Sequence, residues 1–269
     1  MIDLKEIQFC DPPGFRILAI TDMHIGDGDL RTPERYYLDL TLRNIDILKP
    51  DIVINAGDIL HVMGASGYEE WLARDKHAEQ RLLACWRLYR ECFVDRCPVP
   101  ILDVCLERDK PRWSAARGTG FSHGYRNEQA TFVALCLEED VRIDDALLAE
   151  LEQHAAACGG TLVLAMHYPV EGTCRRETSH WVRQSAELKA LIAKHCRLGI
   201  IVAGHWHNYF TNPPVKEGNV ILCFGGEVNT LSENGNQPWG KVIDCHDDTV
   251  TVTHWDFERE LATATHSVT

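Results

Sequence analysis

The chain has 269 residues, of which 45% are hydrophobic and 25% are charged, an ordinary mix for a globular protein. Aromatic residues occur along its whole length, which excludes disorder as the main state. No apolar segment approaches the roughly 20 residues that a membrane helix needs. Asp and Glu number 40 against 27 for Lys and Arg. The resulting net charge of −13 disfavours a protein that wraps a nucleic-acid backbone.

The N-terminal sequence and the cysteines point to a reducing compartment. The first residues, MIDLKEIQFCDPP, are acidic where a secretory signal has a basic head and an apolar run. The 11 cysteines are odd in number, and several lie inside apolar segments, as Cys85, Cys136 and Cys223 do. These features favour reduced thiols in a core over a disulfide framework. We therefore expect a cytoplasmic protein.

Apolar runs that predict strands alternate with amphipathic stretches that predict helices over the first 200 residues or so. Thr32 followed by Pro33 is typical of a helix start, and Pro50 ends that helix. In chain order we expect a strand at 15–21, a helix from 32 to Pro50, strands at 52–55 and 99–104 with a helix at 68–93 between them, a strand at 131–137, a helix at 144–158, a strand at 162–166, a helix at 185–195 and a strand at 198–203.

The remaining sequence is predicted to be all β. Strands are expected at 220–224, 241–244 and 250–255, with a polar, glycine-rich loop at 226–240 and a frayed tail at 262–269. Strand–helix alternation followed by strands indicates an α/β fold with a mixed sheet. The sequence has no repeat, low-complexity segment or internal linker, so we expect residues 1–269 to form a single domain.

Acidic and imidazole side chains follow four of the predicted strands directly. Open α/β sheets place their ligand sites at the carboxyl ends of strands, so these side chains are expected to meet. A lone Gly-Asp is commonly a turn, but two histidines two residues apart in extended chain lie on one side of the backbone. Imidazoles and carboxylates in one pocket suit Zn, Mn or Fe. The candidate ligands are Asp22, His24, Asp58, His167, His205 and His207.

The ordered set DxH, GD, H and GHxH resembles the motifs of the calcineurin-like metallophosphoesterases, and the resemblance covers about residues 16–256. It implies a four-layer αββα sandwich of two mixed β-sheets flanked by helices, with two divalent metal ions at the strand ends. It also implies how the ligands divide. Asp22, His24 and His207 would hold one metal, His167 and His205 would hold the other, and Asp58 would bridge both.

The sequence departs from the family at the motif that follows the third strand. The family has Gly-Asn-His-Asp or Gly-Asn-His-Glu there, whereas this chain has Leu106-Glu107-Arg108-Asp109. Glu107 takes the place of the asparagine that binds the second metal. Either its carboxylate binds that metal, or the loop is remodelled and the second site is weak or empty. We favour ligation, because a hard anionic oxygen binds a dication at least as well as an amide does.

Arg108 takes the place of the family histidine that assists the leaving group. It forms either an ion pair at the rim with Asp103 or Asp109, or a fixed cation that holds a phosphate oxygen. An arginine cannot release a proton at working pH, so it cannot act as the general acid. The substitution therefore favours substrates with good leaving groups, such as a phosphate released from a diphosphate bond.

Further substrate contacts are expected from two loops. His61 follows the Gly-Asp motif and is predicted to line the pocket. The segment 110–128 contains several cations and aromatic residues, and is either a solvated connector or a lid that holds phosphate and stacks on a ring. In the second interpretation Arg112 and Arg117 contact the substrate.

Together these features predict a metal-dependent hydrolase in which a metal-bridging hydroxide attacks a phosphodiester or diphosphate of a soluble, nucleotide-like substrate. A phosphomonoesterase or phosphoprotein phosphatase is an alternative within the same chemistry. A non-catalytic metal-binding or scaffold member is an alternative of another class, because the Asn-His pair is lost. The net charge makes a DNA nuclease a weaker candidate, and the sequence does not indicate an oligomeric state.

Overall fold

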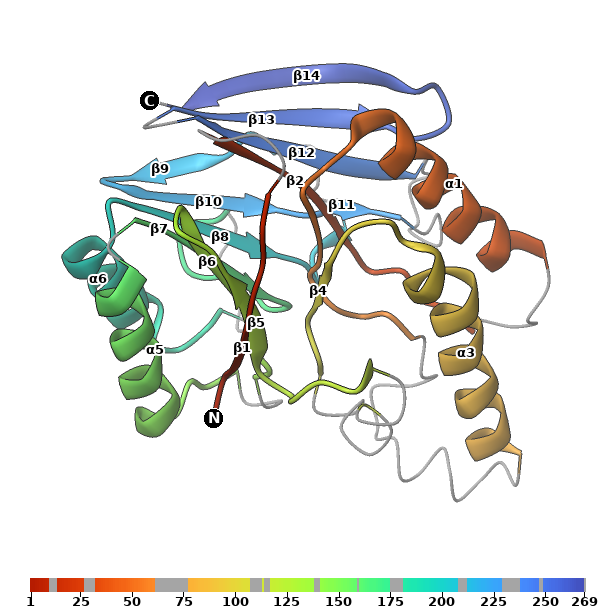
Figure 1. Cartoon of the computed structure of the whole chain (residues 1–269), viewed down its shortest axis with the longest axis horizontal. Helices are drawn as coiled ribbons and strands as arrows, with labels where there is room; N and C mark the ends of the chain where they lie inside the picture. Colours follow the sequence, from red (N-terminus) through yellow and green to blue (C-terminus); the bar gives the residue numbers. More distant parts are fainter. Residues whose placement is uncertain are drawn as a thin grey trace.

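The computed structural model describes residues 1–9, 14–26, 32–60, 77–106, 113, 117–137, 141–158, 160–174, 181–207, 212–228, 238–246 and 249–268. Two β-sheets form the centre, and helices cover their outer faces (Figure 1). None of the described helices combines the length and apolar character that crossing a membrane requires.

The first sheet has seven strands and contains the last three strands of the chain. Its strand order is β14-β13-β12-β2-β3-β4, and β11 pairs in parallel with β2. The three strands β2, β3 and β4 run parallel, whereas β12, β13 and β14 form an antiparallel meander. The bounds are β2 (Gly14–Thr21), β3 (Ile52–Asn55), β4 (Ile101–Asp103), β11 (Gly226–Glu227), β12 (Trp239–His246), β13 (Thr249–Asp256) and β14 (Leu261–Val268).

The second sheet also has seven strands, in the order β1-β5-β6-β7-β8-β10-β9. Its centre is a parallel run of β6, β7, β8 and β10. Every residue of these four strands is buried, which explains why their sequences are continuous apolar runs rather than alternating ones. The bounds are β1 (Asp3–Glu6), β5 (His123–Arg126), β6 (Ala130–Ala134), β7 (Thr161–Met166), β8 (Leu198–Ala203), β9 (Val215–Glu217) and β10 (Val220–Phe224).

The helices complete the outer two layers. Helices α1 (Thr32–Leu48) and α3 (Ala78–Cys92) share one apolar cluster with the first sheet, and a short 3-10 turn, η1 (Val94–Arg96), follows α3. Helices α5 (Asp145–Cys158) and α6 (Ser185–His195) share a second cluster with the second sheet. A third cluster fills the space between the sheets. The four-layer αββα sandwich predicted from the motifs is therefore confirmed.

Several sequence predictions need correction. The prediction of a frayed tail at 262–269 is wrong, because β14 pairs with β13 along its length. The segment 226–240 is not simply a loop, since it contains β11 and the first residues of β12. The helix expected at 68–93 is seen as α3, and residues 68–76 lie outside the described residues.

Candidate metal centre

The candidate ligands lie in the loops that follow four strands, and backbone hydrogen bonds connect these loops in pairs. In the first sheet, the Asp22 N–H donates to the Gly57 carbonyl at 2.9 Å and the His24 N–H to the Asp58 carbonyl at 3.0 Å. In the second sheet, the Gly204 N–H donates to the His167 carbonyl at 2.9 Å. These bonds set the loops after β2 and β3, and those after β7 and β8, side by side.

Two further bonds join the sheets at this edge. The His205 N–H donates to Asp22 Oδ2 at 3.1 Å, and His167 Nδ1 lies 3.0 Å from the Ala56 carbonyl oxygen. The second bond requires a proton on Nδ1, so in the neutral ring Nε2 is the nitrogen that can bind a cation. The carboxyl ends of strands from both sheets therefore converge on one buried region.

Left-handed backbone conformations concentrate at the candidate ligands. Positive φ angles occur at Asp22 (51°), His24 (46°), Asp58 (51°) and His205 (72°). Asp and His tolerate this region better than most residues do, but each such residue still costs on the order of 1–3 kcal/mol. Strain of this kind gathers at functional sites, where the surrounding structure holds it in place.

Two glycines are required where the strand ends come together. Gly57 has a φ of 97°, and a Cβ on it would lie 3.2 Å from the His167 ring. A Cβ on Gly204 would lie 2.1 Å from Thr21 Oγ1 and 3.0 Å from Asp22 Oδ2. The Gly-Asp and Gly-His motifs thus reflect close approach of the loops as well as their donor atoms.

Asp22, His24 and His207 form the first group of converging donors, with one ligand atom from each within 4.8 Å of the others. His207 Nε2 lies 3.1 Å from His24 Nε2 and 3.3 Å from Asp22 Oδ1. Asp22 Oδ2 accepts hydrogen bonds from Thr21 Oγ1 at 2.7 Å and from the His205 N–H. The other oxygen, Oδ1, is buried and accepts no hydrogen bond among the described residues.

Asp22, Asp58 and His167 form the second group. Asp58 Oδ2 lies 3.7 Å from His24 Nε2 and 4.0 Å from His167 Nε2, so it is close to a histidine of each group, and Asp22 is a member of both groups. His205 belongs to neither group. Its ring nevertheless lies beside His167, with the ring centroids 5.2 Å apart.

A buried glutamate that the sequence analysis did not single out completes the cluster. Glu227 Oε1 lies 3.0 Å from His207 Nδ1, and Glu227 is only 2% exposed. Glu227 follows the buried strand β10 by three residues. An acidic residue shortly after an apolar strand was the signal used for Asp22 and Asp58, and the same signal could have identified Glu227.

The charges in this region are strongly coupled. Burial alone would lower the pKa of His207, but Asp22 and Glu227 outweigh burial and raise that pKa to about 10. Burial opposes ionisation of Asp22, yet the surrounding His207, His167 and His24 lower its pKa overall. Burial raises the pKa of Glu227, and His207 partly offsets this. In the metal-free chain, a protonated His207 therefore supplies positive charge to buried carboxylates.

This donor set fits divalent metal ions. Carboxylate and imidazole donors suit Mn, Fe or Zn, and the Nε2 atoms of His24 and His207 lie 3.1 Å apart, close enough for one cation to replace the proton between them. Among the described residues, the buried Asp22 Oδ1 has ion-pair contacts with His24 and His207 but makes no hydrogen bond, and a cation would satisfy it. The structure thus brings five of the seven predicted ligands into two candidate groups and places His205 beside them, and the seventh, Glu107, lies outside the described residues.

The remaining predicted site residues have different outcomes. Glu107, Arg108, His61 and Arg112 lie outside the described residues. Arg117 lies inside the protein, where its Nε is 2.5 Å from Asp103 Oδ2 and its side chain is 7% exposed. The guanidinium is committed to a buried carboxylate, so Arg117 does not present it to a substrate.

The described part of the segment 110–128 is more buried than the predicted alternatives, a solvated connector or a substrate lid, would require. Trp113 is fully buried, and its indole N–H donates to the Gly120 carbonyl at 3.0 Å. Residues 123–126 form β5, which pairs with β1 and β6. Phe121 is 42% exposed. These residues serve mainly as a structural connection between the two sheets.

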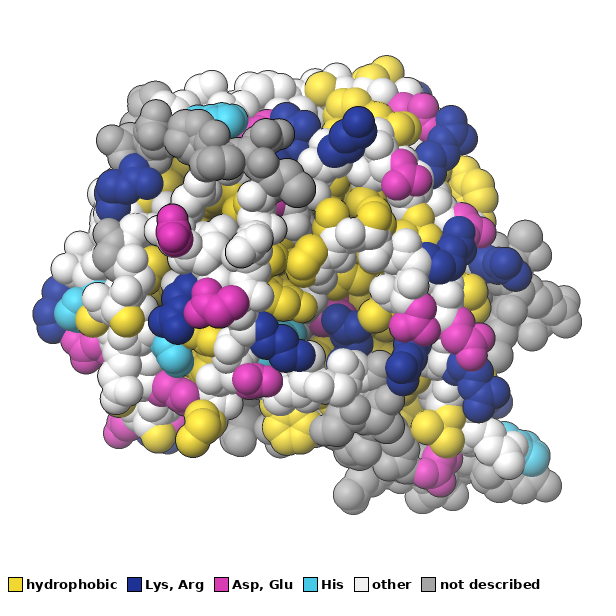
Figure 2. All heavy atoms as spheres, viewed as in Figure 1, with side chains coloured by type: hydrophobic (Ala, Val, Ile, Leu, Met, Phe, Trp, Pro, Cys, Tyr) yellow, Lys and Arg dark blue, Asp and Glu magenta, His cyan; other side chains and the backbone are white. Residues whose placement is uncertain are grey.

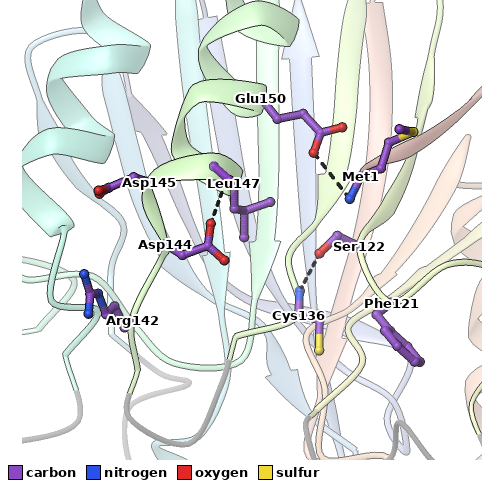
Figure 3. Close-up of a pocket in the computed structure, with 10 residues that line it drawn as sticks. Met1, Phe121, Ser122, Cys136, Arg142, Asp144, Asp145, Leu147 and Glu150 are labelled. Carbon is purple, nitrogen blue, oxygen red and sulfur yellow. Dashed lines mark hydrogen bonds and ion pairs between the residues drawn. The ribbon is translucent and has the colours of Figure 1, made fainter.

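A cavity of about 590 Å³ lies elsewhere, at the N-terminal end of α5. Figure 3 shows that several of its polar groups already have partners in the chain. Glu150 pairs with the N-terminal amine, Asp144 accepts a hydrogen bond from the Leu147 N–H, and Ser122 accepts one from the Cys136 N–H. None of the described candidate ligands lines this cavity, so it is separate from the two donor groups.

Comparison with known proteins supports the fold assignment. No protein-family model matches the sequence, and no curated protein sequence does. Among solved structures, the chain is similar to a dimetal phosphatase from Danio rerio, with a TM-score of 0.65 and 12% identity over 95% of this chain and 98% of that one.

Two further structures have the same architecture. A purple acid phosphatase, PPD1, from yellow lupin (Lupinus luteus) seeds has a TM-score of 0.63 and 12% identity, covering 96% of this chain and 54% of that one. GAP50, described as the anchor in the inner membrane complex of Plasmodium, has a TM-score of 0.58 and 10% identity, covering 95% and 88%. At these identities the similarity shows the fold, and the chain has the calcineurin-like metallophosphoesterase fold.

Proposed function

We propose that this chain is a dinuclear metal-dependent phosphohydrolase. The observation that carries the proposal is the pair of donor groups around Asp22 and Asp58, built from four strand ends, in which Asp22, His24 and Asp58 have left-handed backbone conformations. In this proposal Asp22, His24 and His207 hold one divalent ion. His167 and His205 hold the other with Glu107, and Asp58 bridges both. Mn, Fe and Zn are the metals that suit these donors.

Two bound dications would neutralise phosphate oxygens and make water nucleophilic near neutral pH. The chain's own residues provide the frame for that chemistry. Asp58 is located between the two groups, and His167 directs Nε2 toward it because Nδ1 is engaged by the Ala56 carbonyl. Arg108 would hold a phosphate oxygen and stabilise the charge that develops in the transition state.

The proposed substrate is a soluble phosphodiester or diphosphate, such as a nucleotide. An arginine at position 108 cannot protonate an alkoxide leaving group, so a leaving group that needs no proton is favoured. On the face shown in Figure 2, basic and acidic side chains of the described residues are interspersed. This mixture and the net charge of −13 favour a small substrate over a long nucleic acid. The ten described cysteines are free, which agrees with our proposal of a cytoplasmic location.

A non-catalytic binding or scaffold role is the second candidate. Its support is the loss of the Asn-His pair at positions 107 and 108, together with the similarity in fold to GAP50, whose description is that of an anchor. A phosphomonoesterase or phosphoprotein phosphatase remains the alternative within the hydrolases. Activity on a panel of substrates distinguishes the phosphodiester or diphosphate hydrolase, the phosphatase and the scaffold protein.

The test is a substrate panel on metal-stripped protein supplied with Mn, Zn, Fe or Mg. We expect metal-dependent cleavage of nucleoside diphosphates and aryl phosphodiesters, and slow cleavage of alkyl esters. Arg108→Ala should slow a good substrate by about one to two powers of ten, because a charge-assisted hydrogen bond contributes about 1.5–3 kcal/mol. Arg108→His should help alkyl esters relative to aryl esters.

Two outcomes would overturn the proposal. Preferential turnover of phosphopeptides or simple monoesters would favour the phosphatase alternative. The absence of turnover with every metal would favour the scaffold role.

A further inference from the structure

Glu227 lies beside the metal centre because its strand, β11, pairs with β2, which is far away in the sequence. The two-residue strand β11 pairs in parallel with the end of β2, and Glu227 lies opposite Thr21, directly before Asp22. The Val228 N–H also donates to the Thr21 carbonyl at 3.3 Å. This short ladder sets the Glu227 carboxylate beside the first donor group, although Glu227 is not one of its members.

The surroundings of Glu227 indicate a dedicated role. Both carboxylate oxygens are buried, and burying an unpaired carboxylate is costly. Within the part of the chain that the structure describes, no lysine or arginine pairs with Glu227, and its ion-pair partner is His207 at 3.0 Å. The carboxylate therefore faces the nitrogen of His207 that lies away from Asp22 and His24.

The geometry fixes which nitrogen of His207 binds a cation. A carboxylate at Nδ1 favours a proton there, because the oxygen can only accept. A cation then displaces the proton of Nε2, the atom that lies 3.3 Å from Asp22 Oδ1 and 3.1 Å from His24 Nε2. His167 is arranged in the same way, but its Nδ1 faces a neutral backbone carbonyl instead of a carboxylate.

We propose that Glu227 is a positioning residue that holds His207 in the metal-binding tautomer and orientation at the first metal site. This inference rests on the proposed dinuclear centre. Partners of this kind for metal-bound histidines typically contribute roughly 10- to 100-fold to metal affinity. Glu227→Ala should therefore weaken one of two bound ions by about that factor and leave the other unchanged.

The test measures metal affinity by competition with a chromophoric chelator, using Zn or Mn and the full-length chain. Glu227→Gln keeps an oxygen acceptor and the side-chain volume, so its affinity should fall between those of the wild type and Glu227→Ala. Glu217→Gln is the matched control, because Glu217 pairs with Lys189 on the surface, and it should bind metal as the wild type does. Thermal unfolding of the metal-free variants verifies that each is folded.

A double-mutant cycle separates positioning from direct ligation or general stabilisation. If Glu227 acts through His207, Glu227→Ala should cause no further loss of affinity in a His207→Ala background. Long-range ¹H–¹⁵N spectra of the Zn-loaded wild type should show His207 protonated at Nδ1, and this signature should be lost in Glu227→Ala.

The inference is overturned if Glu227→Ala binds both ions as tightly as the wild type, or if its effect persists fully without His207. A wild-type chain that binds no metal would instead contradict the proposed function itself. The two failures are therefore distinguishable.

Discussion

Replacing Asp58 with asparagine should reduce kcat by about two to three powers of ten. Asp58 Oδ2 lies between His24 Nε2 and His167 Nε2, so its carboxylate is positioned to neutralise and join two cations. Losing one metal ion removes several kcal/mol of charge stabilisation from the transition state, and about 1.4 kcal/mol corresponds to a tenfold change in rate. Asparagine has nearly the same shape and tolerates the left-handed φ of 51°, so the fold should persist.

The measurement is steady-state turnover of an aryl phosphodiester, together with metal content and the melting temperature of the metal-free protein. Asp95→Asn provides the control, because Asp95 is exposed on η1 and pairs with Arg90 at the surface. It should retain wild-type turnover and metal. Wild-type kcat in Asp58→Asn, with two metals still bound, would remove Asp58 from the bridging position.

Replacing Arg117 with methionine should lower the free energy of unfolding by about 3–5 kcal/mol, the cost of leaving one partner of a buried ion pair alone. Asp103 is fully buried, and Arg117 Nε contacts its Oδ2. Tyr89 donates to the other oxygen of Asp103 at 2.5 Å. Burial lowers the pKa of the nearby His123 to about 4 in the wild type, so His123 does not share the neutralisation of Asp103 with Arg117.

Urea unfolding of metal-free protein measures this effect without interference from ligand binding. Asp103→Asn combined with Arg117→Met should recover part of the loss, because the double variant no longer buries an unpaired charge. A loss below about 1 kcal/mol in Arg117→Met would show that the pair behaves like a surface ion pair.

The sequence predicted the central strands well because their environment is simple. Strands β3, β8 and β10 were predicted with the bounds that the structure shows, as was α6. Both faces of these strands are buried, so an uninterrupted apolar run is sufficient to identify them. The candidate ligands follow from the same runs, since each lies where such a run ends.

The strands at the sheet margins could not be predicted in this way. The sequence of β1 is DLKE, and it is identified as a strand only by its pairing with β5. The residues of β14 are mostly exposed, and the strand exists because β13 offers it a hydrogen-bonding edge. The partner of β1 is distant in sequence and that of β14 is the preceding strand, but in both cases pairing rather than an apolar pattern determines the strand.

Two site residues illustrate the same limit. Arg117 lies in a segment rich in cations, which suggested a substrate lid, but Asp103 on β4 pairs with it in the interior. Glu227 lies in a glycine-rich segment, which suggested a loop, but its pairing with β2 places it against His207. In both cases a tertiary contact, rather than the local composition, determines the role of the side chain.

The number of tightly bound metal ions per chain tests the central claim most directly. The wild-type chain is equilibrated with Mn, Zn or Fe, freed of excess ion and analysed by elemental mass spectrometry against protein concentration. The account predicts about two ions per chain with at least one of these metals, falling by about one in His205→Ala and by about one in His207→Ala. A wild-type chain that retains one ion or none with every metal would contradict a dinuclear centre.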